Sequence, residues 1–187
     1  MSYKTIKKIK EKIKNECYNL RHIEPWFYTE HLLAVEKYAN FLLKKLPRAN
    51  KELVLLGVWL HDTQIVRGKR GDHQKEGANE AGKIMREYGY ANDMIKKVQS
   101  IILTHSCDKD IPATLEGKIL ATADAMTHYV NDFYLRIATA GQRDLKGFKL
   151  WALEKLQRDY NKKIFFSFAK EKIKDRHFLL MKLFKMK

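Results

Sequence analysis

The sequence contains little cysteine, proline or glycine, and it has no long apolar run. Two cysteines, Cys17 and Cys107, stand far apart in 187 residues, which excludes a disulfide scaffold and a cysteine-rich zinc module. Three prolines and nine scattered glycines leave no linker-like segment. No apolar run approaches the ~20 residues that cross a bilayer, so we expect no membrane partner. The N-terminus lacks the apolar centre of a secretory signal, which together with scarce cysteine favours a cytoplasmic protein.

Positive charge is abundant and lies mainly at the two ends of the chain. The formal net charge is +15. Residues 1–16 hold six lysines against two glutamates, and residues 142–187 hold fourteen lysines and arginines against five acidic residues. The remainder is nearly balanced. This excess favours a phosphate-bearing substrate, although the solvated faces of lysine-rich helices explain the same pattern.

Apolar residues repeat every three or four positions almost throughout the chain, which predicts helices. The fold class expected is therefore all-α, a single-domain bundle of roughly seven to eight helices over residues 1–187. Within it we distinguish an N-terminal helix (1–27), a central core (28–130) and basic C-terminal helices (131–187). The expected helices are 3–20, 30–46, 51–60, 73–88, 93–105, 115–130, 143–160 and 168–186, and Thr29 is expected to cap the second of them.

The dipeptide His61-Asp62 closes the most apolar of these helices, GVWLHD. An imidazole and a carboxylate are costly to bury unless a partner satisfies them. A divalent metal would do so, and so would hydrogen bonds at the end of the helix. Further polar residues share the apolar side of other helices: His31, His73, His105 and Asp124. One metal centre would satisfy all of them together, whereas separate burial would require a partner for each.

These residues resemble the signature of the HD-domain superfamily of metal-dependent phosphohydrolases. The order His31, His61-Asp62 and Asp124 matches the His, His-Asp, Asp pattern of that superfamily. The segments GDHQKEGANEAGKIM and ILTHS are similar to those that supply further histidines in its binuclear members. The resemblance covers about half of the chain, from Tyr28 to Met126.

The resemblance implies a metal site and a reaction. His31, His61, Asp62 and Asp124 would hold one divalent ion, and Asp62 would bridge to a second ion held by His73 and His105. The ligand types suit manganese, iron, cobalt, nickel or zinc, with magnesium also compatible. The implied activity is hydrolysis of a small phosphate ester, such as a nucleotide, by a metal-activated hydroxide. Asp62 is then the catalytic residue at the metal.

This chain departs from the superfamily pattern at one position. Some mononuclear members carry a catalytic glutamate three residues after the His-Asp aspartate, where this chain has Ile65. No separate general base is assigned for that reason. Three histidines match no element of the pattern, and we expect them to be ordinary surface or packing residues: His22, His128 and His177.

Cations near the expected metal ligands are candidates for binding the substrate phosphate. Arg67, Lys69 and Arg70 lie in a glycine-flanked loop between Asp62 and His73, and arginine suits phosphate recognition. Lys118 precedes Asp124 on the same expected helix. A flexible solvated loop and a surface lysine are the competing interpretations.

Two other functions stay open at the level of sequence. Some proteins that resemble this superfamily use the same His/Asp set to hold two irons and oxidise their substrate with oxygen. The C-terminal helices also interleave lysines with aromatic residues, an arrangement that can stack on nucleic-acid bases. Core packing explains those aromatics as well. The sequence specifies neither the substrate nor the oligomeric state.

Overall fold

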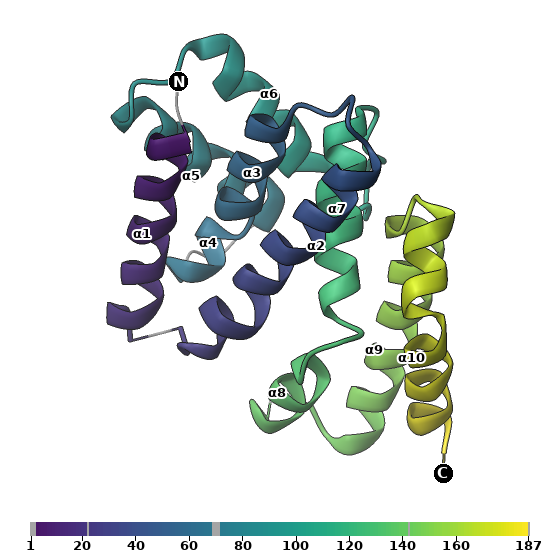
Figure 1. Cartoon of the computed structure of the whole chain (residues 1–187). Coiled ribbons are helices and arrows are strands. Elements are labelled where there is room, and N and C mark those ends of the chain that lie inside the picture. The colour runs from purple at the N-terminus through teal and green to yellow at the C-terminus, as the bar shows by residue number, and fades with distance from the viewer. Residues whose placement is uncertain (1–2, 22, 69–71, 142, 187) are drawn as a thin grey trace.

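The computed structural model describes residues 3–21, 23–68, 72–141 and 143–186, and within these ranges the chain is helical with no strand (Figure 1). The all-α prediction is therefore confirmed. The first seven α-helices and one π-helical segment, η1, are α1 (Tyr3–Asn19), η1 (Phe27–Leu32), α2 (Leu33–Lys45), α3 (Lys51–Leu60), α4 (Thr63–Val66), α5 (His73–Glu87), α6 (Asn92–Thr104) and α7 (Leu115–Thr127). The C-terminal part adds α8 (Phe133–Thr139), α9 (Leu145–Arg158), the π-helical η2 (Asp159–Lys163) and α10 (Ser167–Lys185).

All of the expected helices form, and the structure differs from the expectation only in short segments. The short helices α4 and α8 were not expected. The second helix begins before Thr29, as the π-helical segment η1. Thr29 does not cap that helix, because its hydroxyl donates back to the carbonyls of Pro25 and Trp26. Side-chain caps do begin α3, α5, α7 and α9, at Asn50, Asp72, Thr114 and Asp144.

Helix α3 lies at the centre of the fold and carries the chain into the site. Every residue from Leu53 to Leu60 is buried, and α1, α2, α6 and α7 all pack against this helix. Burial of each large apolar side chain contributes about 1.5–3 kcal/mol. The helix cannot slide or rotate without exposing that surface, so the His61-Asp62 dipeptide at its end is held firmly inside the molecule.

The other helices meet around that end. Helix α2 packs along α7, and α5 pairs with α6. Helices α9 and α10 form a hairpin beside α7, and η2 contacts α7 at the point where the two helices connect (Figure 1). The N-terminal half and the C-terminal segment therefore both reach α7, which carries Asp124.

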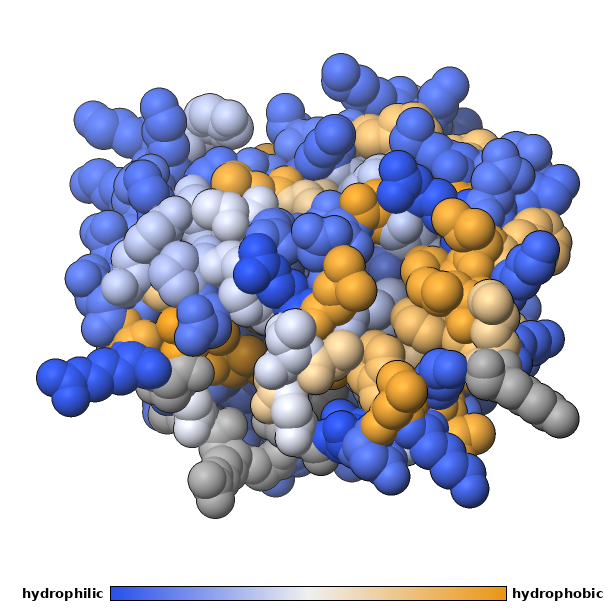
Figure 2. All heavy atoms as spheres, turned by 90° about the horizontal axis from the view of Figure 1, so that it is seen from below, coloured by the Kyte–Doolittle hydropathy of each residue, from blue (hydrophilic) through white to orange (hydrophobic). Residues whose placement is uncertain are grey.

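One region of the surface of the described residues is rich in apolar side chains. Hydrophobic side chains gather on the lower face on the side of α8, α9 and α10 (Figure 2). The exposed large apolar residues of these helices are Leu135, Leu145, Leu150, Phe178, Leu179 and Leu183. The two cysteines are buried and unpaired. Among the described residues, no helix is both long and apolar enough to span a bilayer.

Candidate metal centre

Five expected ligands from five different elements converge inside the protein. His31 belongs to η1, His61 follows α3, Asp62 precedes α4, His105 follows α6, and Asp124 lies in α7. None of them is more than 7% exposed. Burial of three imidazoles and two carboxylates at one point requires a group that compensates both.

The distances between their polar atoms suit a shared cation. The Nε2 atoms of His31 and His61 each lie 3.2 Å from Asp62 Oδ2. The same two atoms lie 3.6 and 3.9 Å from Asp124 Oδ1. His105 Nε2 lies 3.9 Å from the other oxygen of Asp62, Oδ1. Ligands held about 2.1 Å from one ion lie roughly 3–3.5 Å apart, so this spacing fits metal coordination after small adjustments.

The histidine rings are oriented by the hydrogen bonds of their outer nitrogens. His61 Nδ1 lies 2.9 Å from the carbonyl oxygen of Val58, and His105 Nδ1 lies 2.6 Å from that of Ile102. A carbonyl only accepts, so each Nδ1 carries a proton and each Nε2 is directed into the site. This is the ring orientation that a metal requires.

The ring of His31 is oriented in the same way, by a hydrogen bond from its Nδ1 to a hydroxyl group. Thr127 Oγ1 donates to the carbonyl of Asp124 at 2.7 Å and therefore accepts from His31 Nδ1 at 3.3 Å. The buried His61 Nε2 has no hydrogen-bond partner among the described residues. A buried ring nitrogen that has no hydrogen-bond partner and faces two carboxylates fits a bound divalent ion, and we conclude that the donor set suits the metal implied by the sequence.

The electrostatics of the site favour a cation at this position. Burial lowers the pKa of His61, but the charges of Asp62 and Asp124 outweigh burial and raise it to about 9. Burial raises the pKa of Asp62, but His61 and the hydrogen bond from His31 bring it well below its ordinary value. Burial and the charge of His61 lower the pKa of His105 to about 4. The carboxylate is thus ionised and His105 is neutral at pH 7, as ligands must be, whereas His61 carries a proton that a bound metal would displace.

His128 also belongs to the site, contrary to the sequence-based expectation of an ordinary residue. It is 4% exposed, and its Nε2 lies 3.7 Å from Asp124 Oδ1. Burial and the charge of Lys155 lower its pKa to about 4. The spacing of four residues after Asp124 on one helix face is the sequence signal that points to it. Of the other two histidines, His177 stacks on Tyr160 in the C-terminal hairpin, and His22 lies outside the described residues.

A cavity of about 360 Å³ opens onto these ligands, and cations form part of its wall. Lys155, Arg158 and Lys163 line it together with His31, Asp62, His105, Asp124 and His128. Lys163 is 2% exposed, and its Nζ lies 2.5 Å from Asp124 Oδ2. These three cations come from α9 and η2, a contact that spans 39 residues for Lys163 and Asp124 and that no local pattern predicts.

Two of the cations expected to bind phosphate lie away from this cavity. Arg67 is held by Glu16 and Glu80, at 2.7 and 2.6 Å. Lys118 lies over the ring of Phe165. Neither is among the residues that line the cavity, so their positions do not support the expected role. Lys69, Arg70 and the side chain of His73 lie outside the described residues.

Four aromatic residues of the C-terminal helices pack inward. Trp151, Tyr160, Phe166 and Phe168 are partly buried against the core. This is the packing alternative to the nucleic-acid interpretation, and it leaves these rings poorly placed for stacking on bases.

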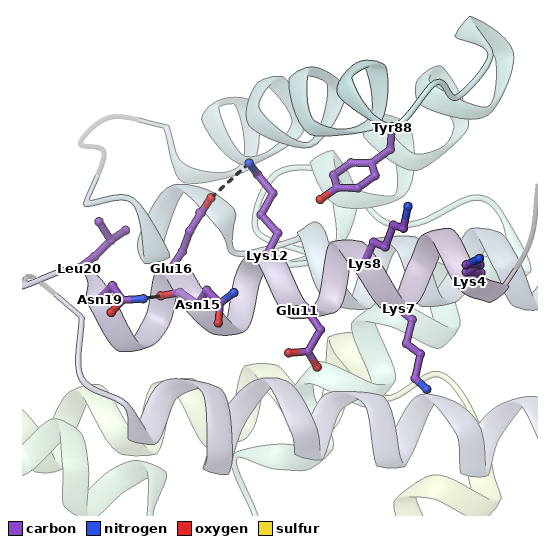
Figure 3. Close-up of a pocket in the computed structure, with 10 residues that line it drawn as sticks. All are labelled: Lys4, Lys7, Lys8, Glu11, Lys12, Asn15, Glu16, Asn19, Leu20 and Tyr88. Carbon is purple, nitrogen blue, oxygen red and sulfur yellow. Dashed lines mark hydrogen bonds and ion pairs between the residues drawn. The ribbon is translucent and has the colours of Figure 1, made fainter.

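A second hollow, of about 780 Å³, lies along α1. Its wall includes Lys4, Lys7, Lys8 and Lys12, and Figure 3 shows Tyr88 extending toward this side of α1 from the end of α5. None of the described metal-ligand candidates lines it, so the larger hollow is not the chemical centre.

Comparison with known families agrees with this geometry. The family model of the HD domain matches residues 28–128, which is more than half of the chain. The match includes all of the converging ligands and stops before α9 and η2. Searches of curated proteins and of solved structures find no match.

Proposed function

Because the chain belongs to the HD domain family, we propose that it is a metal-dependent phosphohydrolase that cleaves a small phosphate ester, such as a nucleotide. The observation that carries the proposal is the cavity whose wall holds both the metal-ligand candidates and the cations Lys155, Arg158 and Lys163. A small phosphate ester needs both, since its phosphoryl group must be held and its charge balanced.

His31, His61, Asp62 and Asp124 would hold a divalent ion of manganese, iron, cobalt, nickel or zinc, with magnesium also compatible. Such an ion would lower the pKa of a bound water and so supply hydroxide at neutral pH. Asp62 has a second oxygen directed toward His105, which supports a bridging role to a second ion held with His73 and His105.

The chain's own residues provide binding and shape. Lys155, Arg158 and Lys163 present positive charge to a bound anion, and Asp62 stays ionised because the buried histidines lower its pKa. The cavity of about 360 Å³ falls within the range of small-molecule sites, roughly 300–1,000 Å³. A nucleotide or smaller ester therefore fits the size and the charge of this site better than a polymer does.

The test is metal content and phosphate release in matched variants. The protein would be stripped with a chelator, reloaded with each metal separately, and assayed with p-nitrophenyl phosphate and a panel of nucleotides. We expect Asp62→Asn to lose bound metal and to lower phosphate release to background. Asp93→Asn, an exposed carboxylate on α6, should match the wild type.

Two results would overturn the proposal. One is full phosphate release from Asp62→Asn, which would place the chemistry elsewhere. The other is two bound irons with oxygen consumption and no phosphate release, which would assign the same ligands to an oxygenase.

A further inference from the structure

His128 and Asp124 present their polar atoms to the same point of the cavity. The Nε2 atom of His128 lies 3.7 Å from Asp124 Oδ1, nearly the distance that separates His31 Nε2 from the same oxygen. The rings of His31 and His128 are parallel within 5°. Donor atoms of His31, Asp124 and His128 all lie within 4.8 Å of one another, as do those of His31, His61 and Asp62. The two groups overlap at His31.

A buried carboxylate orients His128 from behind. His128 Nδ1 lies 2.8 Å from Asp159 Oδ2, and Asp159 is fully buried. The carboxylate accepts a hydrogen bond from the protonated Nδ1, so Nε2 presents its lone pair to the cavity. A carboxylate that holds a histidine from behind is the arrangement that metal-ligating histidines typically show. A packing histidine needs neither the buried carboxylate nor a place on the cavity wall.

Asp159 is itself kept ionised by the segment that carries it. Lys155 Nζ lies 3.2 Å from Asp159 Oδ2, and Arg158 Nε lies 3.7 Å from Oδ1. Burial raises the pKa of Asp159, but the charges of Lys155 and Lys163 bring it well below its ordinary value. The family match stops at His128, so Asp159 and its partners come from a part of the chain that the HD domain does not include.

We propose that His128 is a further ligand of the metal centre, oriented by Asp159, so that the C-terminal segment completes the site. This inference rests on the metal centre of the proposed function and adds to it a ligand that the His, His-Asp, Asp pattern lacks. With His128 added, the first ion would have three imidazole ligands, and imidazole favours nickel, cobalt, iron or zinc over magnesium.

The experiment measures cobalt binding rather than activity. Chelator-treated wild type, His128→Gln, Asp159→Asn and the control His177→Gln would be titrated with CoCl₂, with Kd from calorimetry and the coordination state from visible absorption. We expect His128→Gln to raise Kd at least tenfold and to change the cobalt spectrum. Asp159→Asn should raise Kd with a smaller spectral change, since loss of an orienting partner costs roughly 10–100-fold in affinity. The control should match the wild type.

The outcomes separate this inference from the proposed function. If His128→Gln binds cobalt as the wild type does while His31→Gln does not, the added ligand is wrong and the centre stands. If His31→Gln and Asp124→Asn also bind normally, the centre itself is wrong. X-ray absorption of the wild type with one equivalent of cobalt gives a check that does not depend on folding of the variants. Three imidazole ligands around the cobalt would support the inference, and two would overturn it.

Discussion

A buried histidine is suited to bind a metal ion only when one ring nitrogen faces the ion and the other is held by a hydrogen bond. In this site the outer nitrogens of His61 and His105 are satisfied by the carbonyl three residues earlier on the same helix. His128 uses a carboxylate from a distant segment. The inner nitrogens are therefore fixed without the metal, and binding an ion would cost little reorganisation.

Gly77 sets how closely α5 approaches the end of α3. A Cβ atom at this position would lie 2.8 Å from the carbonyl oxygen of His61, and a backbone atom does not move easily. We expect Gly77→Ala to lower the free energy of unfolding by about 1–3 kcal/mol and to weaken metal binding, because His61 must shift. Urea denaturation and cobalt titration would measure the two effects.

Gly82 provides the matched control on the same helix. Its added Cβ would meet the amide end of Gln99, which is a flexible side chain that can turn away. Gly82→Ala should leave metal affinity unchanged. Equal loss of affinity in both variants would contradict the argument, since it would point to general damage to α5.

The ligands from η1, α3, α6 and α7 could be predicted from sequence because each one sits on the apolar side of its own helix. His31, His105 and Asp124 follow that rule. The role of His128 was missed, although its spacing from Asp124 was visible, because it matches no element of the known pattern. Asp159 was beyond prediction, since the sequence does not show which face of α7 the C-terminal hairpin covers.

At the scale of elements, the two π-helical segments both supply the site. Segment η1 carries His31, and η2 carries Asp159 and Lys163. A π-helical turn inserts one residue into a helix and turns its side chains to a new face, and such turns concentrate at functional sites. Sequence periodicity assumes 3.6 residues per turn, so it placed helices here but could not place these turns.

Lys163 joins η2 to α7 through a buried ion pair. Its ammonium lies 2.5 Å from Asp124 Oδ2, and its carbonyl accepts from the hydroxyl of Thr122. We expect Lys163→Met to lower the stability of the metal-free protein by about 3–5 kcal/mol, because the substitution removes the lysine partner of the buried Asp124 carboxylate. Urea denaturation in the presence of a chelator would measure this.

A double-mutant cycle tests whether the loss belongs to the pair. Lys163→Met combined with Asp124→Asn should recover part of the stability, since neither charge then remains buried alone. The exposed Lys182→Met on α10 should have almost no effect. Additive losses in the double variant would mean that the pair itself contributes nothing.

At the scale of the whole molecule, the excess of positive charge bears on the anionic substrate proposed for this site. The net charge is +15, and three of the cations line the cavity itself. A long-range field accelerates the capture of an anionic substrate from any direction, whereas cations in the cavity act only at short range. The two contributions differ in their response to salt.

Salt dependence of the hydrolysis rate separates these contributions. Raising the ionic strength from about 0.01 M to about 0.1 M shortens the Debye length from roughly 30 Å to roughly 10 Å. We expect kcat/KM for a phosphate monoester to fall roughly three- to tenfold over this range. The value of kcat should stay nearly constant, because the bound substrate lies among cations too close to be screened.

Charge-neutralising variants then locate the source of the field. Lys155→Gln with Arg158→Gln removes cations from the cavity wall, and Lys7→Gln with Lys8→Gln removes the same charge from the hollow along α1. We expect the first pair to raise KM strongly and to leave the salt slope mostly intact. The second pair should reduce the salt slope slightly with no other effect. Equal changes in KM from the two pairs would mean that α9 has no special place at the site, and that the molecule attracts its substrate by net charge alone.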